Sequence, residues 1–167
     1  TTGAFPVRVE VSLADAVRSS SQGTLHALKA RDSQIQTVML TGDNPVVAAL
    51  VAESLGQVDV VKAGLLPEDK LAVVQALQAE ANGVAMIGDG VNDAPALAAA
   101  SVGIAMGGAG SAQAMETADV VLMQDDLARL PDLVRTSRRA RQIILQNITF
   151  SLAIKVAFLI LTLPGWA

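Results

Sequence analysis

The stretch 88–95, Gly-Asp-Gly-Val-Asn-Asp-Ala-Pro, constrains the fold more than any other part of this chain. It follows the short apolar run 84–87, whose length and composition are typical of a buried strand. Gly88 and Gly90 allow a tight turn, and Ala94-Pro95 before an alanine-rich segment predicts the start of a helix. In open α/β sheets, ligands bind at the carboxyl ends of the strands. The stretch therefore predicts an α/β protein with a ligand site at this point.

Two carboxylates in this stretch, Asp89 and Asp93, are expected to project from one turn, close enough to share a cation. Hard carboxylate oxygens, with room left for water and a phosphate oxygen, suit Mg²⁺. The alternative is an ordinary Gly/Asn/Asp turn in which Asp93 caps the following helix.

A second strand–loop–helix unit surrounds Thr41. The apolar run 35–40 leads into Thr41-Gly42-Asp43, and the following Asn44-Pro45 starts a helix that Gly56 ends. A threonine hydroxyl and backbone N–H groups in such a loop can donate hydrogen bonds to phosphoryl oxygens. Thr-Gly-Asp is also a common turn, so the residues alone leave both interpretations open.

Lys70 lies in the first turn of a helix predicted over 67–81, after Pro67 and two acidic residues. A cation gains nothing from the helix dipole at this end, whereas the acids do. A compact ammonium on a long stem suits a phosphoryl group. From the residues alone, a surface lysine paired with a neighbouring acid fits as well.

The three motifs at 41–44, 67–70 and 88–95 together resemble the phosphorylation domain of P-type ATPases, cation pumps of the haloacid dehalogenase superfamily. The resemblance implies a Rossmann-like parallel sheet with flanking helices, followed by a long helix entering the membrane, with Mg²⁺ and ATP as cofactors. Thr41 and Lys70 would hold the phosphoryl group, and Asn92 would position it by hydrogen bonds. Gly42 and Asp43 would belong to the phosphate or nucleotide site, and the resemblance makes Asp89 and Asp93 the Mg²⁺ ligands.

Charge is distributed unevenly along the chain. Residues 1–134 hold 7 basic and all 16 acidic side chains, whereas residues 135–167 hold 5 basic and none acidic. The acidic part argues against a nucleic-acid surface, and a basic cluster just before an apolar run indicates a membrane boundary. The absence of cysteine excludes a Cys-x-x-Cys metal module within this chain and fits a reducing compartment.

The run 143–163 contains 21 residues and one charge, Lys155, and a helix of that length can cross a bilayer. Four arginines before it predict that its amino end, and with it residues 1–142, lies in the cytoplasm. A buried core helix is the alternative. Lys155 near mid-span, with Asn147 on an adjoining helix face, predicts part of an ion pathway. Asn147, Lys155 and Pro164-Gly165 resemble the zinc/cadmium/lead branch of the heavy-metal pumps, which favours Zn²⁺, Cd²⁺ or Pb²⁺ as cargo.

The resemblance covers only part of such a pump: the later portion of the phosphorylation domain (1–134), a basic juxtamembrane helix (135–142) and one transmembrane helix (143–163). The family's Asp-Lys-Thr-Gly-Thr nucleophile segment does not occur in this sequence. We therefore expect a fragment that is inactive alone and works with a nucleotide-binding domain, an actuator domain and other membrane helices. Two alternatives are a soluble haloacid-dehalogenase-like phosphatase and a truncated, membrane-anchored binding module without turnover.

The remaining pattern predicts strands at 7–11, 58–61, 102–106 and 118–122, and a helix to about Ala30 capped by the serines at 19–21. Four methionines lie in or at the ends of strands, where filling of the core is the expected role. They are Met39, Met86, Met106 and Met123.

Overall fold

The computed structural model describes residues 8–11, 19–88, 92–107, 116–124 and 126–162. Within these residues the chain divides into two compact units, Thr1–Arg129 and Leu130–Ala167. The first unit alternates strands and helices, which confirms the predicted α/β class.

The sheet of the first unit has six parallel strands in the order β3-β2-β1-β4-β5-β6. The strands are β1 (Arg8–Val11), β2 (Thr37–Leu40), β3 (Val60–Lys62), β4 (Val84–Gly88), β5 (Val102–Met106) and β6 (Val120–Leu122). Because all strands run the same way, the loops after β2, β3 and β4 emerge at one edge of the sheet. Each of the three motifs found in the sequence starts at this edge: 41–44 follows β2, 67–70 begins the helix after β3, and 88–95 starts with the last residue of β4.

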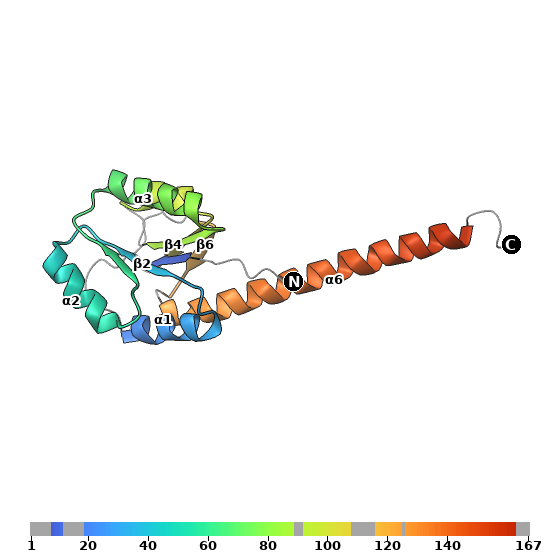
Figure 1. The fold of residues 1–167 in the computed structure, drawn as a ribbon, viewed down its shortest axis with the longest axis horizontal. Helices are drawn as coiled ribbons and strands as arrows, with labels where there is room; N and C mark the ends of the chain where they lie inside the picture. Colours follow the sequence, from blue (N-terminus) through green and yellow to red (C-terminus); the bar gives the residue numbers. More distant parts are fainter. Residues whose placement is uncertain (1–7, 12–18, 89–91, 108–115, 125, 163–167) are drawn as a thin grey trace. The chain divides into compact units, whose positions relative to one another are not determined.

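Helices connect the strands and cover both faces of the sheet (Figure 1). The described part of the first unit contains α1 (Ser19–Arg31), α2 (Pro45–Leu55), α3 (Pro67–Glu80), α4 (Ala94–Ala99) and the 3₁₀ turn η1 (Leu127–Arg129). Helices α3 and α4 contact each other, and α1 contacts α2 and η1. Figure 1 shows α3 across the sheet from α1 and α2.

Local sequence accounts for the ends of α2. The Asn44 side chain accepts hydrogen bonds from the N–H groups of Val46 and Val47, both at 3.0 Å, and Pro45 occupies the first turn. Gly56 ends the helix with φ of 68°, a left-handed conformation that favours glycine. The sequence predicted both ends of α2 correctly because its start and stop signals are local.

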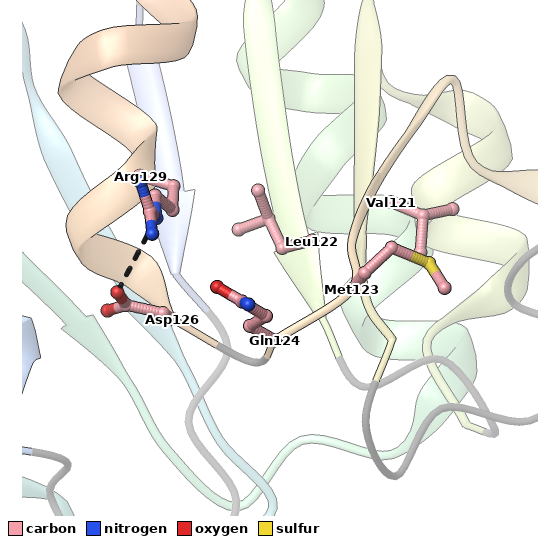
Figure 2. Close-up of a pocket in the computed structure, with 6 residues that line it drawn as sticks. All are labelled: Val121, Leu122, Met123, Gln124, Asp126 and Arg129. Atoms are coloured by element: carbon pink, nitrogen blue, oxygen red, sulfur yellow. Dashed lines mark ion pairs between the residues drawn. The ribbon is translucent and has the colours of Figure 1, made fainter.

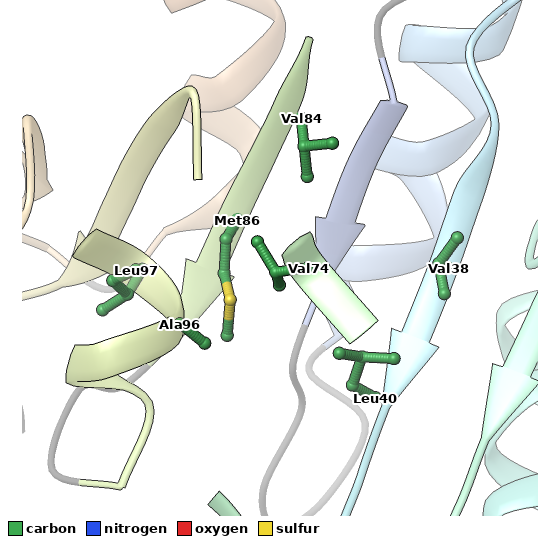
Figure 3. Packing of buried hydrophobic residues seen from close by; sticks show 7 residues of the cluster. All are labelled: Val38, Leu40, Val74, Val84, Met86, Ala96 and Leu97. Carbon is green, nitrogen blue, oxygen red and sulfur yellow. The ribbon is translucent and has the colours of Figure 1, made fainter. Parts of the chain in front are cut away.

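The core lies between the sheet and the α3–α4 layer (Figure 3). Side chains from β2, α3, β4 and α4 meet there, and each is at most 2% exposed. They are Val38, Leu40, Val74, Val84, Met86, Ala96 and Leu97. Since neighbouring residues of a strand point to opposite faces, Thr37 and Met39 face the other layer, and they are buried as well. The sheet is therefore buried on both faces at β2, as expected for a parallel sheet.

Two sequence predictions need correction. The serines at 19–21 do not cap α1 from outside, because the helix already includes Ser19 and continues to Arg31. Met123 does not fill the core, because β6 ends at Leu122 and the methionine is 72% exposed, whereas Met39, Met86 and Met106 are buried.

The second unit is the 33-residue helix α6 (Leu130–Thr162). At 1.5 Å per residue it is about 50 Å long. The structure has one helix long and apolar enough to cross a membrane among the residues it describes, and the apolar window of that helix is not buried at all. The basic segment 135–142 and the apolar segment from 143 are thus parts of one continuous helix, up to Thr162.

Candidate functional site

An ion pair between Lys70 and Asp93 lies at the centre of the candidate site. Lys70 is in the first turn of α3, and its Nζ donates a 2.7 Å hydrogen bond to Oδ1 of Asp93, which directly precedes α4. The two side chains are only 12% and 4% exposed. A buried charge is tolerated when it is paired, so the contact offsets the cost of burying both side chains at this position.

The alternative role of Asp93 as a helix cap is not seen. Asp93 occupies the N-cap position of α4, but its side chain makes no capping hydrogen bond. Only its backbone carbonyl takes part in the helix, accepting from the N–H of Leu97 at 2.8 Å. The carboxylate is directed instead to the lysine on the neighbouring helix.

Gly88, the last residue of β4, leaves room for the Asp93 carboxylate. A Cβ atom on Gly88 would lie 2.8 Å from Asp93 Oδ2, closer than real Cβ atoms come to other atoms, and 3.0 Å from Asp93 Cβ, which is tighter than most real contacts. The carboxylate therefore packs directly over the end of β4. Glycine is needed here because a Cβ atom would collide with Asp93. The tight turn predicted from the motif does not by itself indicate this collision.

The Thr41 loop forms a second, compact part of the site after β2. Thr41 is 5% exposed, and its hydroxyl donates to Asp43 Oδ2 at 2.8 Å while accepting from the Asp43 N–H at 3.1 Å. The threonine hydroxyl was predicted to face a phosphoryl group. In this structure it is engaged within its own loop, and Asp43 fixes its orientation.

Backbone hydrogen bonds join this loop to the connection between β3 and α3. The Thr41 N–H donates to the carbonyl of Lys62 at 3.0 Å, and the N–H of Leu65 donates to the carbonyl of Thr41 at 3.1 Å. The N–H of Gly64 donates to the carbonyl of Asp43 at 2.8 Å. Gly42 approaches the same connection, since a Cβ on it would lie 3.3 Å from the Leu65 carbonyl oxygen. The loop bearing Thr41 and the segment leading to Lys70 are thus held together.

The other predicted site residues divide into two groups. Asn92 is exposed beside Asp93, and Asp89 lies outside the described residues. Asn147 and Lys155 are both exposed on α6, in the second unit. Among the residues that the structure describes, no three His, Cys, Asp or Glu side chains gather as a metal site, so Asp93 is the single described member of the predicted cation pair.

A pocket of about 300 Å³ lies beyond the end of β6 (Figure 2). Its lining contains none of the predicted site residues and consists of Val121, Leu122, Met123, Gln124, Asp126 and Arg129. Figure 2 shows the Asp126–Arg129 ion pair, with 3.9 Å between the closest atoms, on one side of it. Both side chains of this pair are well exposed, so the pair itself is weak.

A polar cluster at the opposite end of the strands was not predicted from the sequence. Asp59, just before β3, accepts a 2.7 Å hydrogen bond from the backbone N–H of Thr37 and an ionic hydrogen bond from Lys29. The Thr37 hydroxyl lies 2.9 Å from the same Asp59 oxygen. Burial acts to raise the pKa of Asp59, but the hydrogen bonds from Lys29 and Thr37 outweigh it and hold the pKa below its ordinary value. The cluster ties α1 to the amino ends of β2 and β3, away from the candidate site.

Comparison with known proteins places this geometry in a family. Residues 4–101 match the haloacid dehalogenase-like hydrolases. A probable cadmium-transporting ATPase of Listeria monocytogenes is 53% identical over 156 residues, which cover 93% of this chain and 22% of the relative. A manganese-exporting P-type ATPase of Mycobacterium tuberculosis is 48% identical over 155 residues, covering 93% of this chain and 21% of that protein. The chain therefore spans about a fifth of the length of these curated relatives.

Solved structures agree with the sequence comparison. The crystal structure of a zinc-transporting PIB-type ATPase in the E2.Pi state superposes with a TM-score of 0.82 at 44% identity, covering 92% of this chain and 24% of that one. A 3-deoxy-D-manno-octulosonate 8-phosphate phosphatase from Moraxella catarrhalis has a TM-score of 0.64 at 18% identity, covering 86% of this chain and 93% of that one. The second likeness shows the fold alone. The resemblance to P-type ATPases that the three motifs indicated is confirmed, as is the resemblance to their heavy-metal branch that the residues of the apolar helix indicated, and the chain belongs to the haloacid dehalogenase-like hydrolase family.

Proposed function

We propose that this chain is part of an ATP-driven heavy-metal pump and supplies the phosphate-contacting and Mg²⁺-binding side chains of its phosphorylation domain. The observation that carries the proposal is the buried Lys70–Asp93 ion pair, which brings together two sequence motifs 23 residues apart at the carboxyl edge of the sheet. This edge is where open α/β sheets bind ligands. The acceptor of the phosphoryl group would be an aspartate outside this chain.

In this proposal Lys70 neutralises charge on the transferring phosphoryl group, and Thr41 orients it with a hydrogen bond. The hydroxyl of Thr41 is already directed by Asp43, so it can exchange this internal partner for a phosphoryl oxygen with little rearrangement. Phosphoryl transfer needs positioning and charge stabilisation more than covalent help from the protein, and these residues offer both. Asn92, exposed beside Asp93, would add a further hydrogen bond.

The chemistry of the residues also fits a magnesium ion. Carboxylate oxygens are the hard donors that Mg²⁺ selects, and the ion commonly takes one or two carboxylates while keeping several waters. Asp93 and Asp89 would hold it, and when bound it would offset negative charge on phosphate oxygens. The hydrogen bond from Lys70 would hold the Asp93 carboxylate in place in the absence of the ion.

The apolar part of α6 would be the membrane-spanning segment, so residues 1–142 would face the cytoplasm. Its length, exposure and preceding arginines support this assignment. Asn147 and Lys155 would line an ion pathway. A long exposed apolar helix also has no evident use in a soluble phosphatase, which makes that alternative the weaker one.

The proposal is tested by phosphoenzyme formation in the full-length pump that carries this sequence. With labelled ATP and Mg²⁺, Asp93→Asn and Lys70→Gln should each lower the level of acid-stable phosphoenzyme at least about a hundredfold, as loss of one charge-stabilising group does elsewhere. Asp89→Asn should behave in the same way. Asp126→Asn is the matched control, because it also removes a carboxylate of the first unit but lines the separate pocket. Undiminished Mg²⁺-dependent turnover in Asp93→Asn would refute the assignment.

The cargo is tested in the same preparation by adding divalent metals one at a time. The relatives transport cadmium, zinc or manganese according to their names, and we propose Zn²⁺, Cd²⁺ or Pb²⁺ for this chain. These ions should stimulate ATP hydrolysis, and Lys155→Met should abolish the stimulation. Stimulation by Mn²⁺ alone would assign the protein to another branch.

A further inference from the structure

Four arginines occupy seven consecutive positions of α6, directly before its apolar segment. All four are exposed: Arg135, Arg138, Arg139 and Arg141. At 1.5 Å per residue they span about 9 Å along the helix axis. The four arginines are thus concentrated in a band narrower than two helical turns.

The chain supplies little negative charge to balance this band. Asp132 is the last acidic residue in the sequence, and it pairs with Arg135 at 3.2 Å. Arg138 and Arg139 are three and four residues from Arg135, and Arg141 is three residues from Arg138, so side chains of the same charge are neighbours on the helix surface. Like charges at these spacings destabilise a helix, and an external anion between them would remove the repulsion.

The position of the arginine band along the helix indicates that the anion is the phosphate of a lipid headgroup. If the hydrocarbon of a bilayer begins near Ile143, Arg141 lies about 3 Å from that boundary and Arg138 about 7.5 Å from it. The polar headgroup layer of one leaflet is roughly 5–8 Å deep. Arg138, Arg139 and Arg141 therefore lie level with lipid phosphates, whereas Arg135, about 12 Å from the boundary, lies farther out.

We propose that Arg138, Arg139 and Arg141 form a binding site for the headgroups of anionic phospholipids and select them over neutral ones. This inference rests on the proposed membrane-spanning role of α6. Guanidinium groups bind phosphate with two parallel hydrogen bonds, which a lysine cannot do. A neutral phosphatidylcholine carries its own cation beside the phosphate, so the net attraction favours an anionic lipid such as phosphatidylglycerol.

The test uses the full chain reconstituted in phosphatidylcholine vesicles that contain a trace of spin-labelled lipid. Electron spin resonance then measures how strongly labelled phosphatidylglycerol, compared with labelled phosphatidylcholine, is immobilised at the protein surface. Each engaged arginine should favour the anionic lipid roughly fivefold at its own site, so the average over all lipids around the helix should be a smaller but clear preference. The triple variant Arg138→Gln/Arg139→Gln/Arg141→Gln should bring the preference close to one.

A matched control removes three positive charges from the first unit instead. Arg31→Gln/Lys62→Gln/Arg129→Gln has the same net charge as the triple variant but keeps the arginine band, so its preference for phosphatidylglycerol should equal that of the unchanged chain. A preference that persists in the band variant, for example because Lys155 carries it, would overturn the inference. Loss of the preference on adding inorganic phosphate, but not chloride of equal ionic strength, would also overturn it, since free phosphate would then be the ligand.

Insertion is measured separately, by extraction of the same vesicles with alkaline carbonate. A chain that is extracted refutes the membrane-spanning role and thereby the proposed function of α6. A chain that stays in the membrane but shows no lipid preference refutes the headgroup site alone.

Discussion

Replacing Gly88 by alanine should destabilise the first unit through a collision with the Asp93 carboxylate. The new methyl carbon would lie 2.8 Å from Oδ2, 3.0 Å from Cβ and 3.3 Å from Cγ of Asp93. Because the collision includes Cβ, which lies next to the backbone, rotation of the carboxylate alone does not relieve it. The start of α4 has to move, or Asp93 has to leave Lys70.

The magnitude follows from these two routes. Moving α4 is overpacking of a close-packed region, which costs about 1–3 kcal/mol. Breaking the 2.7 Å ion pair instead leaves a charge that is only 4% exposed without its partner, at a cost of about 3–5 kcal/mol. The cheaper route sets the expected loss at about 1–3 kcal/mol. Gly88 does not have a positive φ, so the backbone itself accepts alanine and would otherwise gain about 0.4–1 kcal/mol.

Differential scanning calorimetry of the full chain in detergent should show the melting temperature of Gly88→Ala lowered by roughly 3–12 °C. Gly83→Ala is the matched control, since it lies just before the same strand and its new Cβ would meet only Ser101 Oγ, at an ordinary 3.9 Å. That variant should melt at or above the temperature of the unchanged chain. If Gly88→Ala were as stable as Gly83→Ala, the close packing of Asp93 over β4 would be wrong.

Three further predictions concern other contacts of the first unit. Lys70→Met should lower the free energy of unfolding by about 3–5 kcal/mol by isolating Asp93, and adding Asp93→Leu should restore part of it, giving a coupling of about 0.5–3 kcal/mol in a double-mutant cycle measured by calorimetry. The pKa of Asp59 is lower in the folded chain than in the unfolded chain, so the unfolded chain takes up protons first as the pH falls. The stabilisation that ionised Asp59 provides is therefore present above about pH 4 and is lost as the pH drops through the lower pKa of the folded chain. Between about pH 5 and pH 3 the melting temperature should therefore fall less steeply with decreasing pH in Asp59→Asn than in the unchanged chain, and an equal slope would contradict this. Gly23→Ala should raise stability by about 1 kcal/mol, because Gly23 lies inside α1 with nothing within 4 Å of a new Cβ, and a lower melting temperature would show that the helix needs glycine there.

The sequence predicts well those features that depend on neighbouring residues. The ends of α2 follow from Asn44, Pro45 and Gly56, which act within one turn of the helix. The strand before Gly88 follows from a short apolar run bounded by turn residues. These signals act over a few residues, so one sequence contains them completely.

Features that depend on packing between distant elements were not predictable. The Lys70–Asp93 pair forms because α3 and α4 contact each other on one face of the sheet, and no spacing rule relates residues 23 positions apart. The sequence identified both residues but assigned each a separate partner. Met123 was assigned to the core because it follows an apolar strand, yet β6 ends one residue earlier and the side chain turns to solvent.

Three main-chain hydrogen bonds join the Thr41 loop to the β3–α3 connection. Side-chain substitutions in this connection leave its donors and acceptors in place, whereas proline at Leu65 would remove a donor. A displacement of Thr41 also pulls on the segment that starts α3, and so on Lys70. The two residues proposed to contact phosphate are thus linked through main-chain atoms, and we expect a ligand that shifts one of them to shift the other as well.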